Sequence, residues 1–242
     1  PMPSAEYEDH AYKHRKLERL PLLFTILTVV AILIGGLVEL IPLYLIKSNV
    51  PTLSTVTPYS PLELEGRDIY IREGCVNCHS QMVRPFRSET ARYGDYSKAG
   101  ESVYNHPFLW GSKRTGPDLA REGVIGRSHA WHYLHMENPQ STSPGSIMPD
   151  YRWLLQNRIR TRDTARKVSV MRDLGVPYPM YFEDIAVQRL EEQAEEIASE
   201  LRELLPERAE TLYADREIIA LIAYLQRLGV DATKEVPYEE EL

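Results

Sequence analysis

The chain has 242 residues, of which 43% are hydrophobic, and a formal net charge of −7 at pH 7. This length suits one domain with a membrane anchor and an added element, and we expect no nucleic-acid partner. The only two cysteines leave no second pair for a four-ligand zinc site, and the remaining histidines form no matching knuckle. Apolar residues at helical spacing predict a mainly α fold, with one N-terminal transmembrane helix and a helical domain with insertions.

A long apolar run near the N-terminus predicts a membrane anchor. Leu20 to Val38 contains no charge, and the apolar character continues to Ile46, interrupted only by Glu39 and Pro42. About 20 apolar residues cross a bilayer core, so the run is long enough to span once with some tilt. A cleaved secretory signal is the alternative, but the run is too long and no Ala-x-Ala-like site follows it. We predict an uncleaved signal anchor over residues 20–46.

Basic residues are distributed unevenly around this run. After it, Lys47 is followed by no basic residue until Arg67. Just before it stand Lys13, Arg15, Lys16 and Arg19. The positive-inside rule therefore predicts a cytoplasmic N-terminal tail, residues 1–19, and an external remainder. In a bacterium this means a single-pass protein of the inner membrane with a periplasmic domain.

Glu39 is a carboxyl group inside the predicted span, where a charge is costly and commonly marks a partner or a function. It lies about two turns from the outer end of the run, so its side chain can partly reach the interface. We interpret Glu39 as an intramembrane contact with another subunit rather than as part of a proton relay.

The external part begins with a linker, residues 47–61, that is rich in Pro, Ser and Thr and predicts an extended conformation. A helix is then predicted from Leu62 to Glu73. Gly66 and Tyr70 are one turn apart on the face that also carries Leu62. This helix leads directly into the two cysteines, and residues 62–242 are predicted to form the periplasmic domain.

The stretch Cys75-Val76-Asn77-Cys78-His79 has the spacing of a c-type haem attachment motif. Each thiol can form a thioether with one haem vinyl group, which brings His79 to the iron as an axial ligand. A redox dithiol is the main alternative, but that motif follows a strand in a βαβ pattern, whereas the preceding segment here is helical. We predict one covalent haem c on Cys75 and Cys78.

The second axial ligand decides whether the iron keeps an open position. Five methionines follow the motif: Met82, Met136, Met148, Met171 and Met180. Met82 is only three residues from His79 and cannot reach the opposite haem face. Met148 lies in a loop rich in Pro and Gly, which can hold a side chain over the iron without regular structure. Met136 lies in a helical stretch, residues 129–136, that also holds three histidines. We predict Met148; a histidine or no protein ligand is the alternative.

Two helices are predicted near the C-terminus. Phe182 to Leu205 lies within an acidic element, about residues 180–210, and has an apolar stripe at helical spacing. Residues 183–210 carry ten acidic and three basic side chains, a balance of −7, so the rest of the chain is neutral overall. This face either steers a basic partner or is merely solvated while its stripe packs on the domain. The last helix is predicted at about residues 215–228, ending before Gly229.

The helix at 62–73 and the helix at 215–228 resemble the crossed terminal helices of class I cytochromes c, in which a glycine lets the backbones approach. That resemblance assigns this role to Gly66. It also implies that the carbonyl of Pro117, in Thr115-Gly116-Pro117, accepts a hydrogen bond from the axial histidine. The Met148-Pro149 pair resembles the ligand loop of the same class.

The chain also resembles the membrane-anchored monohaem subunit, subunit II, of cbb3-type cytochrome c oxidases. The resemblance covers the span and nearly all of residues 60–155. Its most specific segments are Cys78 to Arg87 (Cys-His-Ser-Gln-Met-Val-Arg-Pro-Phe-Arg), Arg92 to Gly94, Trp110 to Leu119, and Met148 to Tyr151. Generic cytochromes c lack the long insert, residues 80–115, between His79 and Gly116.

This resemblance implies an electron-transfer role in a complex that reduces oxygen. The expected partners are the haem–copper catalytic subunit, a dihaem cytochrome c subunit and periplasmic cytochromes c. The chain itself has no copper site and no catalytic centre of its own. A free-standing membrane-anchored cytochrome c that shuttles electrons is the first alternative, and a haem-based ligand sensor is the second.

Three basic residues of the insert are candidate partners of the haem propionates, because a guanidinium matches the geometry of a carboxylate. They are Arg84, Arg87 and Arg114. Contacts with the surface or with another subunit explain them equally well.

Overall fold

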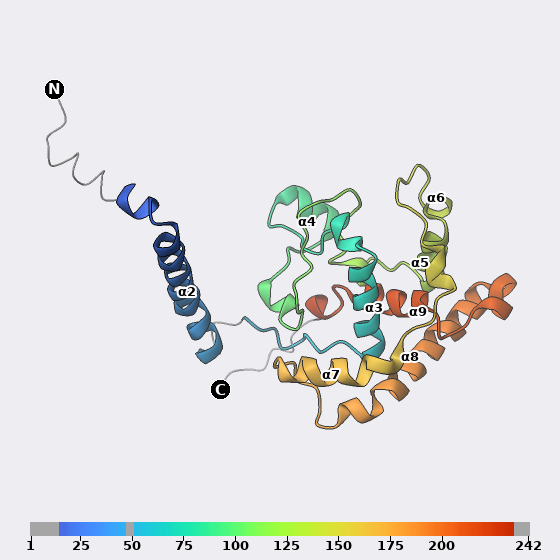
Figure 1. Cartoon of the computed structure of the whole chain (residues 1–242). Coiled ribbons are helices and arrows are strands. Elements are labelled where there is room, and N and C mark those ends of the chain that lie inside the picture. Colours follow the sequence, from blue (N-terminus) through green and yellow to red (C-terminus); the bar gives the residue numbers. More distant parts are fainter. Residues whose placement is uncertain (1–14, 47–50, 235–242) are drawn as a thin grey trace, which may run out of the picture. The chain divides into compact units, whose positions relative to one another are not determined.

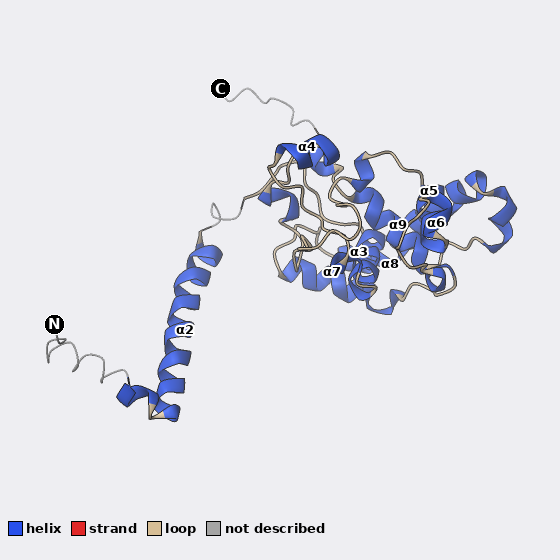
Figure 2. Ribbon diagram, turned by 90° about the horizontal axis from the view of Figure 1, so that it is seen from above, coloured by secondary structure: helices blue, strands red, loops and turns tan. Residues whose placement is uncertain are grey.

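A computed structural model describes residues 15–46 and 51–234 of the chain. The chain divides into two compact units, Pro1–Pro51 and Thr52–Leu242. Most of the predicted cytoplasmic tail, including Lys13, and residues 47–50 of the predicted linker lie outside the described residues. Figure 2 shows helices and loops throughout the described parts, and the predicted mainly α fold is confirmed.

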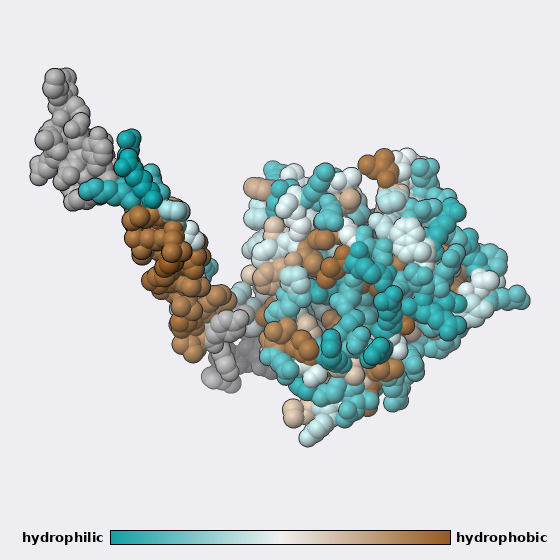
Figure 3. Space-filling model, in the orientation of Figure 1, coloured by the Kyte–Doolittle hydropathy of each residue, from teal (hydrophilic) through white to brown (hydrophobic). Residues whose placement is uncertain are grey.

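The first unit contains one long apolar helix, α2 (Pro21–Leu45). Residues Pro21–Leu43 have a mean hydropathy of 2.5 and none of them is buried, and the surface of α2 is mostly apolar in Figure 3. The hydroxyls of Thr25 and Thr28 donate to backbone carbonyls one turn earlier, both at 2.8 Å, which satisfies these polar groups within the helix. At about 1.5 Å per residue, α2 is long enough to cross a hydrocarbon core of about 30 Å. Glu39 lies on α2 with an exposed side chain.

The second unit is a helical domain. Its α-helices are α3 (Pro61–Arg72), α4 (Arg87–Tyr93), α5 (His129–Glu137), α6 (Pro139–Thr142), α7 (Thr164–Asp173), α8 (Phe182–Leu204) and α9 (Glu217–Arg227). Short 3-10 turns connect them, and within residues 51–234 the only β pairing is an isolated bridge between Arg158 and Arg216.

Helices α3 and α9 cross at the centre of the domain (Figure 1). A β-carbon on Gly66 would lie 1.9 Å from the backbone oxygen of Ala220, so only glycine permits this approach. Tyr70 and Tyr224 fill the crossing with ring centroids 5.4 Å apart. A capping box at Ser60 starts α3, because the Ser60 hydroxyl and the Glu63 carboxylate each accept a backbone N–H of the other residue.

Helix α8 covers one side of this crossing. Its apolar stripe is buried in the same core as α3 and α9, and consists of Leu190, Ala194, Ile197 and Leu201. The acidic side chains of α8 lie mostly on its exposed face. Helix α7 packs against α8 around Val168 and Met171, which form a second apolar cluster with Ala186.

The predicted insert, residues 80–115, contains α4 and is otherwise mostly loop (Figure 2). Its ends lie close together, because the backbone N–H of Gln81 donates to the carbonyl of Trp110 at 2.8 Å. The N–H of Gly116 donates to the carbonyl of Cys78 at 3.0 Å. These bonds bring the segment after the insert back beside the cysteine motif.

Candidate haem site

A cavity of about 450 Å³ opens between the cysteine motif, α5, α9 and the loop before residue 150. Cofactor pockets generally occupy about 300–1,000 Å³, so the size suits a large planar group. Its apolar lining includes Leu119, Met136, Leu221 and Leu225. Five residues singled out in the sequence also line it: Cys75, Cys78, His79, Pro117 and Met148.

The cysteine motif forms a single tight turn at the end of α3. Gly74 adopts a left-handed conformation with φ of 72°, which lets the chain leave the helix. The N–H groups of Cys78 and His79 then both donate to the carbonyl of Cys75, at 3.1 and 2.9 Å. This turn brings both thiols and the imidazole to the same cavity, although Cys75 and Cys78 are separated by two residues.

Of the two cysteines, Cys75 is half-buried and Cys78 is exposed. Burial, with a smaller contribution from Glu73, raises the pKa of the Cys75 thiol to about 12. Redox-active dithiols depend on a lowered thiol pKa. The environment of Cys75 is therefore unlike that of a thioredoxin-type motif.

The imidazole of His79 is held by the segment after the insert. Its Nδ1 lies 2.8 Å from the carbonyl oxygen of Pro117. Since a carbonyl oxygen only accepts, Nδ1 carries the proton and Nε2 keeps its lone pair for a metal ion. A β-carbon on Gly116 would lie 2.2 Å from Cε1 of His79, so glycine is needed for the ring to lie against this backbone.

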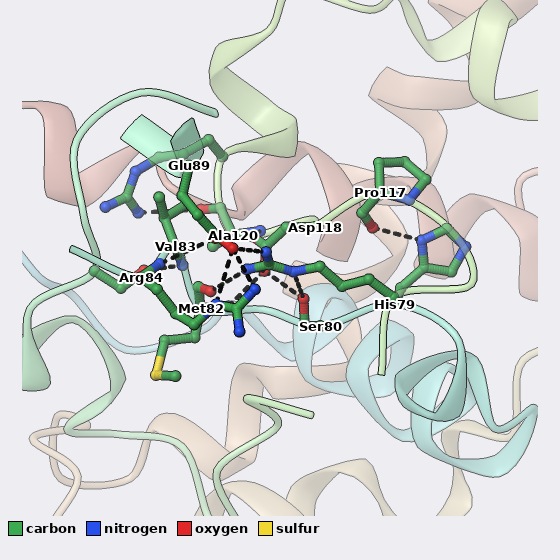
Figure 4. Close-up of polar contacts among 12 residues, drawn as sticks. His79, Ser80, Met82, Val83, Arg84, Glu89, Pro117, Asp118 and Ala120 are labelled. Atoms are coloured by element: carbon green, nitrogen blue, oxygen red, sulfur yellow. Dashed lines mark hydrogen bonds and ion pairs between the residues drawn. The ribbon is translucent and has the colours of Figure 1, made fainter. Parts of the chain in front are cut away.

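A buried polar cluster holds Pro117 in this place (Figure 4). The Asp118 carboxylate accepts the Ser80 hydroxyl at 2.6 Å and the N–H groups of Met82 and Ala120, each at 2.9 Å. Arg114 donates through Nε to the Ser80 hydroxyl, also at 2.6 Å. Asp118 thus ties the segment that presents Pro117 to the segment that follows His79.

Glu89 of α4 completes this cluster. Its carboxylate accepts hydrogen bonds from Arg114 and Arg84, which lower the pKa of Glu89 to about 2. Arg84 and Arg114 are therefore both engaged by one carboxylate, and Arg87 is exposed. None of these three arginines is among the described residues that line the cavity, and their assignment to haem propionates stays a prediction.

The loop that carries Met148 borders the same cavity. Gly145 turns it with φ of 81°, and the Ser146 hydroxyl accepts the N–H of Met148 at 3.2 Å. Met148 is half-buried against the core, whereas the neighbouring Ile147 is 80% exposed. Met136 of α5 is the other methionine among the described lining residues.

The remaining candidate methionines lie elsewhere. Met171 belongs to the apolar cluster between α7 and α8, and Met180 is 71% exposed. Neither of them, nor Met82, is among the described residues that line the cavity.

The model of the protein family described as "Cytochrome C oxidase, mono-heme subunit/FixO" matches residues 14–232. This chain belongs to that family. It is therefore a mono-haem subunit of a cytochrome c oxidase, an oxidoreductase complex, and the resemblance drawn from the motif segments is confirmed. No curated protein matches the chain significantly. The apolar helix α2 agrees with a membrane-anchored subunit.

The cavity fits the single haem that this family implies. It has an apolar lining, an imidazole with a free Nε2, and two thioether sulfurs, those of Met136 and Met148. Methionine and histidine are both common axial ligands of haem iron. Cys75 and Cys78 line the same cavity.

Sequence reasoning missed the side of the cavity formed by α5 and the turn before it. Arg127, Trp131, His132 and His135 line this side. The Arg127 guanidinium lies 4.3 Å from the ring centroid of Trp131, which stacks on His135 at 4.5 Å. Burial lowers the pKa of His132 to about 3, with Arg127 as the next cause, so its imidazole is neutral. These residues have no motif spacing; the only signal was the group of histidines in the helical stretch 129–136.

Proposed function

We propose that this oxidase subunit carries one covalent haem c, with thioethers to Cys75 and Cys78 and with His79 and Met148 as the axial ligands. The observation that supports this most is the single cavity that receives the His79 imidazole, both thiols and the Met148 loop. When bound there, haem supplies a one-electron couple between ferric and ferrous iron.

The surrounding residues orient and shield this group. The Pro117 carbonyl fixes the tautomer and the plane of His79, and the cluster around Asp118 holds Pro117. Leu221 and Leu225 of α9 line the interior with apolar surface that excludes water. With a methionine on the second axial position the iron has no vacancy for oxygen, which suits transfer of electrons rather than oxygen chemistry.

In this proposal the subunit relays electrons within a cbb3-type oxidase. It receives them from a dihaem cytochrome c subunit or a periplasmic cytochrome c, and passes them to the b-type haem of the haem–copper catalytic subunit, where oxygen is reduced. Helix α2 anchors it in the inner membrane with a cytoplasmic N-terminus and a periplasmic domain, and Glu39 contacts another subunit within the membrane.

The test is to purify the assembly in detergent and record its visible spectrum, with a haem stain and subunit identification on the same sample. We expect a covalent c-type haem on this chain, together with a subunit that contains b-type haem and copper. A chain that purifies alone with one low-spin c haem would be an anchored electron shuttle. Binding of carbon monoxide to its c haem would indicate a ligand sensor, and absence of covalent haem would refute the proposal.

A further inference from the structure

We propose that Arg127 and His132 bind the propionates of the haem and raise its reduction potential, with Glu122 positioning Arg127. This inference rests on the proposed haem site. It replaces the arginines of the insert with residues from the other side of the cavity, which the motif spacing did not indicate.

His132 is the first observation. Its side chain is 1% exposed and lines the cavity, yet neither ring nitrogen has a hydrogen-bond partner among the described residues. A carboxylate oxygen of Glu122 lies 3.5 Å from Nε2, and the two atoms are not in hydrogen-bonding geometry. A buried imidazole needs an acceptor for its N–H. A carboxylate within the cavity would supply that acceptor.

Arg127 is the second observation. It is the only Lys or Arg among the described residues that line the cavity. Its Nη1 donates to both carboxylate oxygens of Glu122, at 2.6 and 2.8 Å. Its Nε and Nη2 make no hydrogen bond within the described part of the chain, although a guanidinium has five N–H groups. Arg127 therefore keeps donors for a second carboxylate.

Glu122 and Trp131 fix where that guanidinium lies. Glu122 is 3% exposed, so its negative charge requires the nearby cation. Trp131 supports the guanidinium face at 4.3 Å. Held on two sides, Arg127 loses little conformational entropy when it binds a further anion.

The chemistry of haem decides which anion this is. Haem has two carboxylates, and they lie on the pyrroles that do not carry the vinyl groups. If Cys75 and Cys78 hold the vinyl edge, the groups that meet the carboxylates come from another segment. The cysteine motif and residues 115–117 contribute no cation to the cavity, whereas Arg127 and His132 contribute a cation and a neutral donor.

A cation beside the haem stabilises the reduced iron, which has one positive charge less than the oxidised iron. We expect Arg127→Gln to lower the equilibrium constant for reduction of the c haem by about tenfold, or about 59 mV for one electron. His132→Leu removes a neutral hydrogen-bond donor and no charge, so it should lower this equilibrium constant by a smaller factor, about threefold.

The experiment is a redox titration of the c haem in the purified, detergent-solubilised assembly, with resonance Raman bands of the propionates as a second readout. Arg92→Gln is the matched control, because Arg92 is exposed, has no ion pair among the described residues and does not line the cavity. It removes the same charge and should leave potential and bands unchanged. His132→Gln keeps an N–H donor, so the reduction potential of its c haem should lie close to that of the unsubstituted chain.

The outcomes separate this inference from the haem proposal itself. No covalent haem in the unsubstituted chain would refute the haem site. Haem present, with a potential and Raman bands in Arg127→Gln like those of the unsubstituted chain, would overturn the propionate assignment even if His132→Leu failed to assemble. A larger shift in Arg87→Gln than in Arg127→Gln would also overturn it, in favour of the insert.

Discussion

The two sides of the haem cavity differ in how completely the protein satisfies its own polar groups. On the side of the cysteine motif, Asp118 accepts four hydrogen bonds and His79 is bonded to Pro117. On the side of α5, His132 is buried with neither ring nitrogen paired among the described residues, and Arg127 keeps donors that no described residue accepts. The polar groups of the motif side are satisfied within the described chain, whereas in the proposed haem site the acceptors for the α5 side come from the haem.

This difference indicates separate tasks for the two sides. The motif side fixes the attachment and orientation of His79, which must be correct before the iron is ligated. In the proposed site the α5 side offers charge and hydrogen bonds, which adjust the reduction potential of the bound haem. Variants of the motif side should therefore change whether haem is held, and variants elsewhere in the cavity should change how it behaves.

The largest expected effect comes from removing both cysteines of the motif side. Replacing both Cys75 and Cys78 by alanine removes the thiols that form the thioethers, so we expect essentially no covalent haem on the chain. A haem stain after denaturing electrophoresis measures this. Ser141→Ala, a change of similar size at an exposed position, should stain normally. Undiminished staining of the double variant would contradict covalent attachment at this motif.

A second change tests the backing of His79. In Gly116→Ala the new β-carbon would lie 2.2 Å from Cε1 of His79, so the ring must move and lose its bond to Pro117. We expect haem content to fall severalfold and the remaining haem to show a disturbed axial ligand field, measured by absorption and electron paramagnetic resonance. Lys113→Ala, in the same segment and exposed, should match the unsubstituted chain. An unperturbed Gly116→Ala spectrum would mean that His79 is not held here.

A third change removes Met148, the proposed axial ligand in the loop, and leaves the two cysteines that attach the haem unchanged. Met148→Ala should keep covalent haem but open the sixth position, so the c haem should change from no carbon monoxide binding to nearly complete binding. The measurement is a carbon monoxide difference spectrum. Met180→Ala is the control, because Met180 is 71% exposed and does not line the cavity. If Met136→Leu opened the iron instead, Met136 would be the ligand.

The smallest expected effect concerns pH and the buried cluster on the motif side. The pKa of Glu89 is lowered from 4.5 to about 2 by Arg114 and Arg84, so its contribution to stability is present above pH 4.5 and lost as the pH falls to about 2. Glu89→Gln should therefore lower the thermal midpoint at pH 7, and the difference from the unsubstituted chain should disappear toward pH 2. The same difference at both pH values would show that the charge of Glu89 is not responsible. Glu191→Gln, on the exposed face of α8, should have no effect.

The helices show what local pattern can predict. The predicted helix at 62–73 corresponds to α3, and the predicted helix at 215–228 corresponds to α9, within two residues at each end. Both have apolar residues at helical spacing and clear end signals, such as Ser60 before α3 and Gly229 after α9. The sequence left open whether the stripe of α8 packs on this domain; the structure buries it there.

The arginines show that a local pattern does not predict the partner of a charged side chain. The residue type of Arg84 and Arg114 and their position in the insert predicted that they bind the haem propionates. In the structure Glu89 holds both, and it is 25 residues from Arg114 along the chain. Conversely, no motif or spacing in the sequence indicated Arg127, although it is the arginine among the described residues that line the cavity.

By itself, the sequence determined the apolar span, the cysteine motif, the principal helices and the family, because these depend on spacing within a few turns of the chain. Only the tertiary structure decided which charges face the cavity, that Gly116 lies against His79, and that the buried His132 has no hydrogen-bond partner among the described residues. The physical reason is that the partner of a charged or polar side chain is set by distances between segments far apart in sequence, which the packing of α3, α5 and α9 creates.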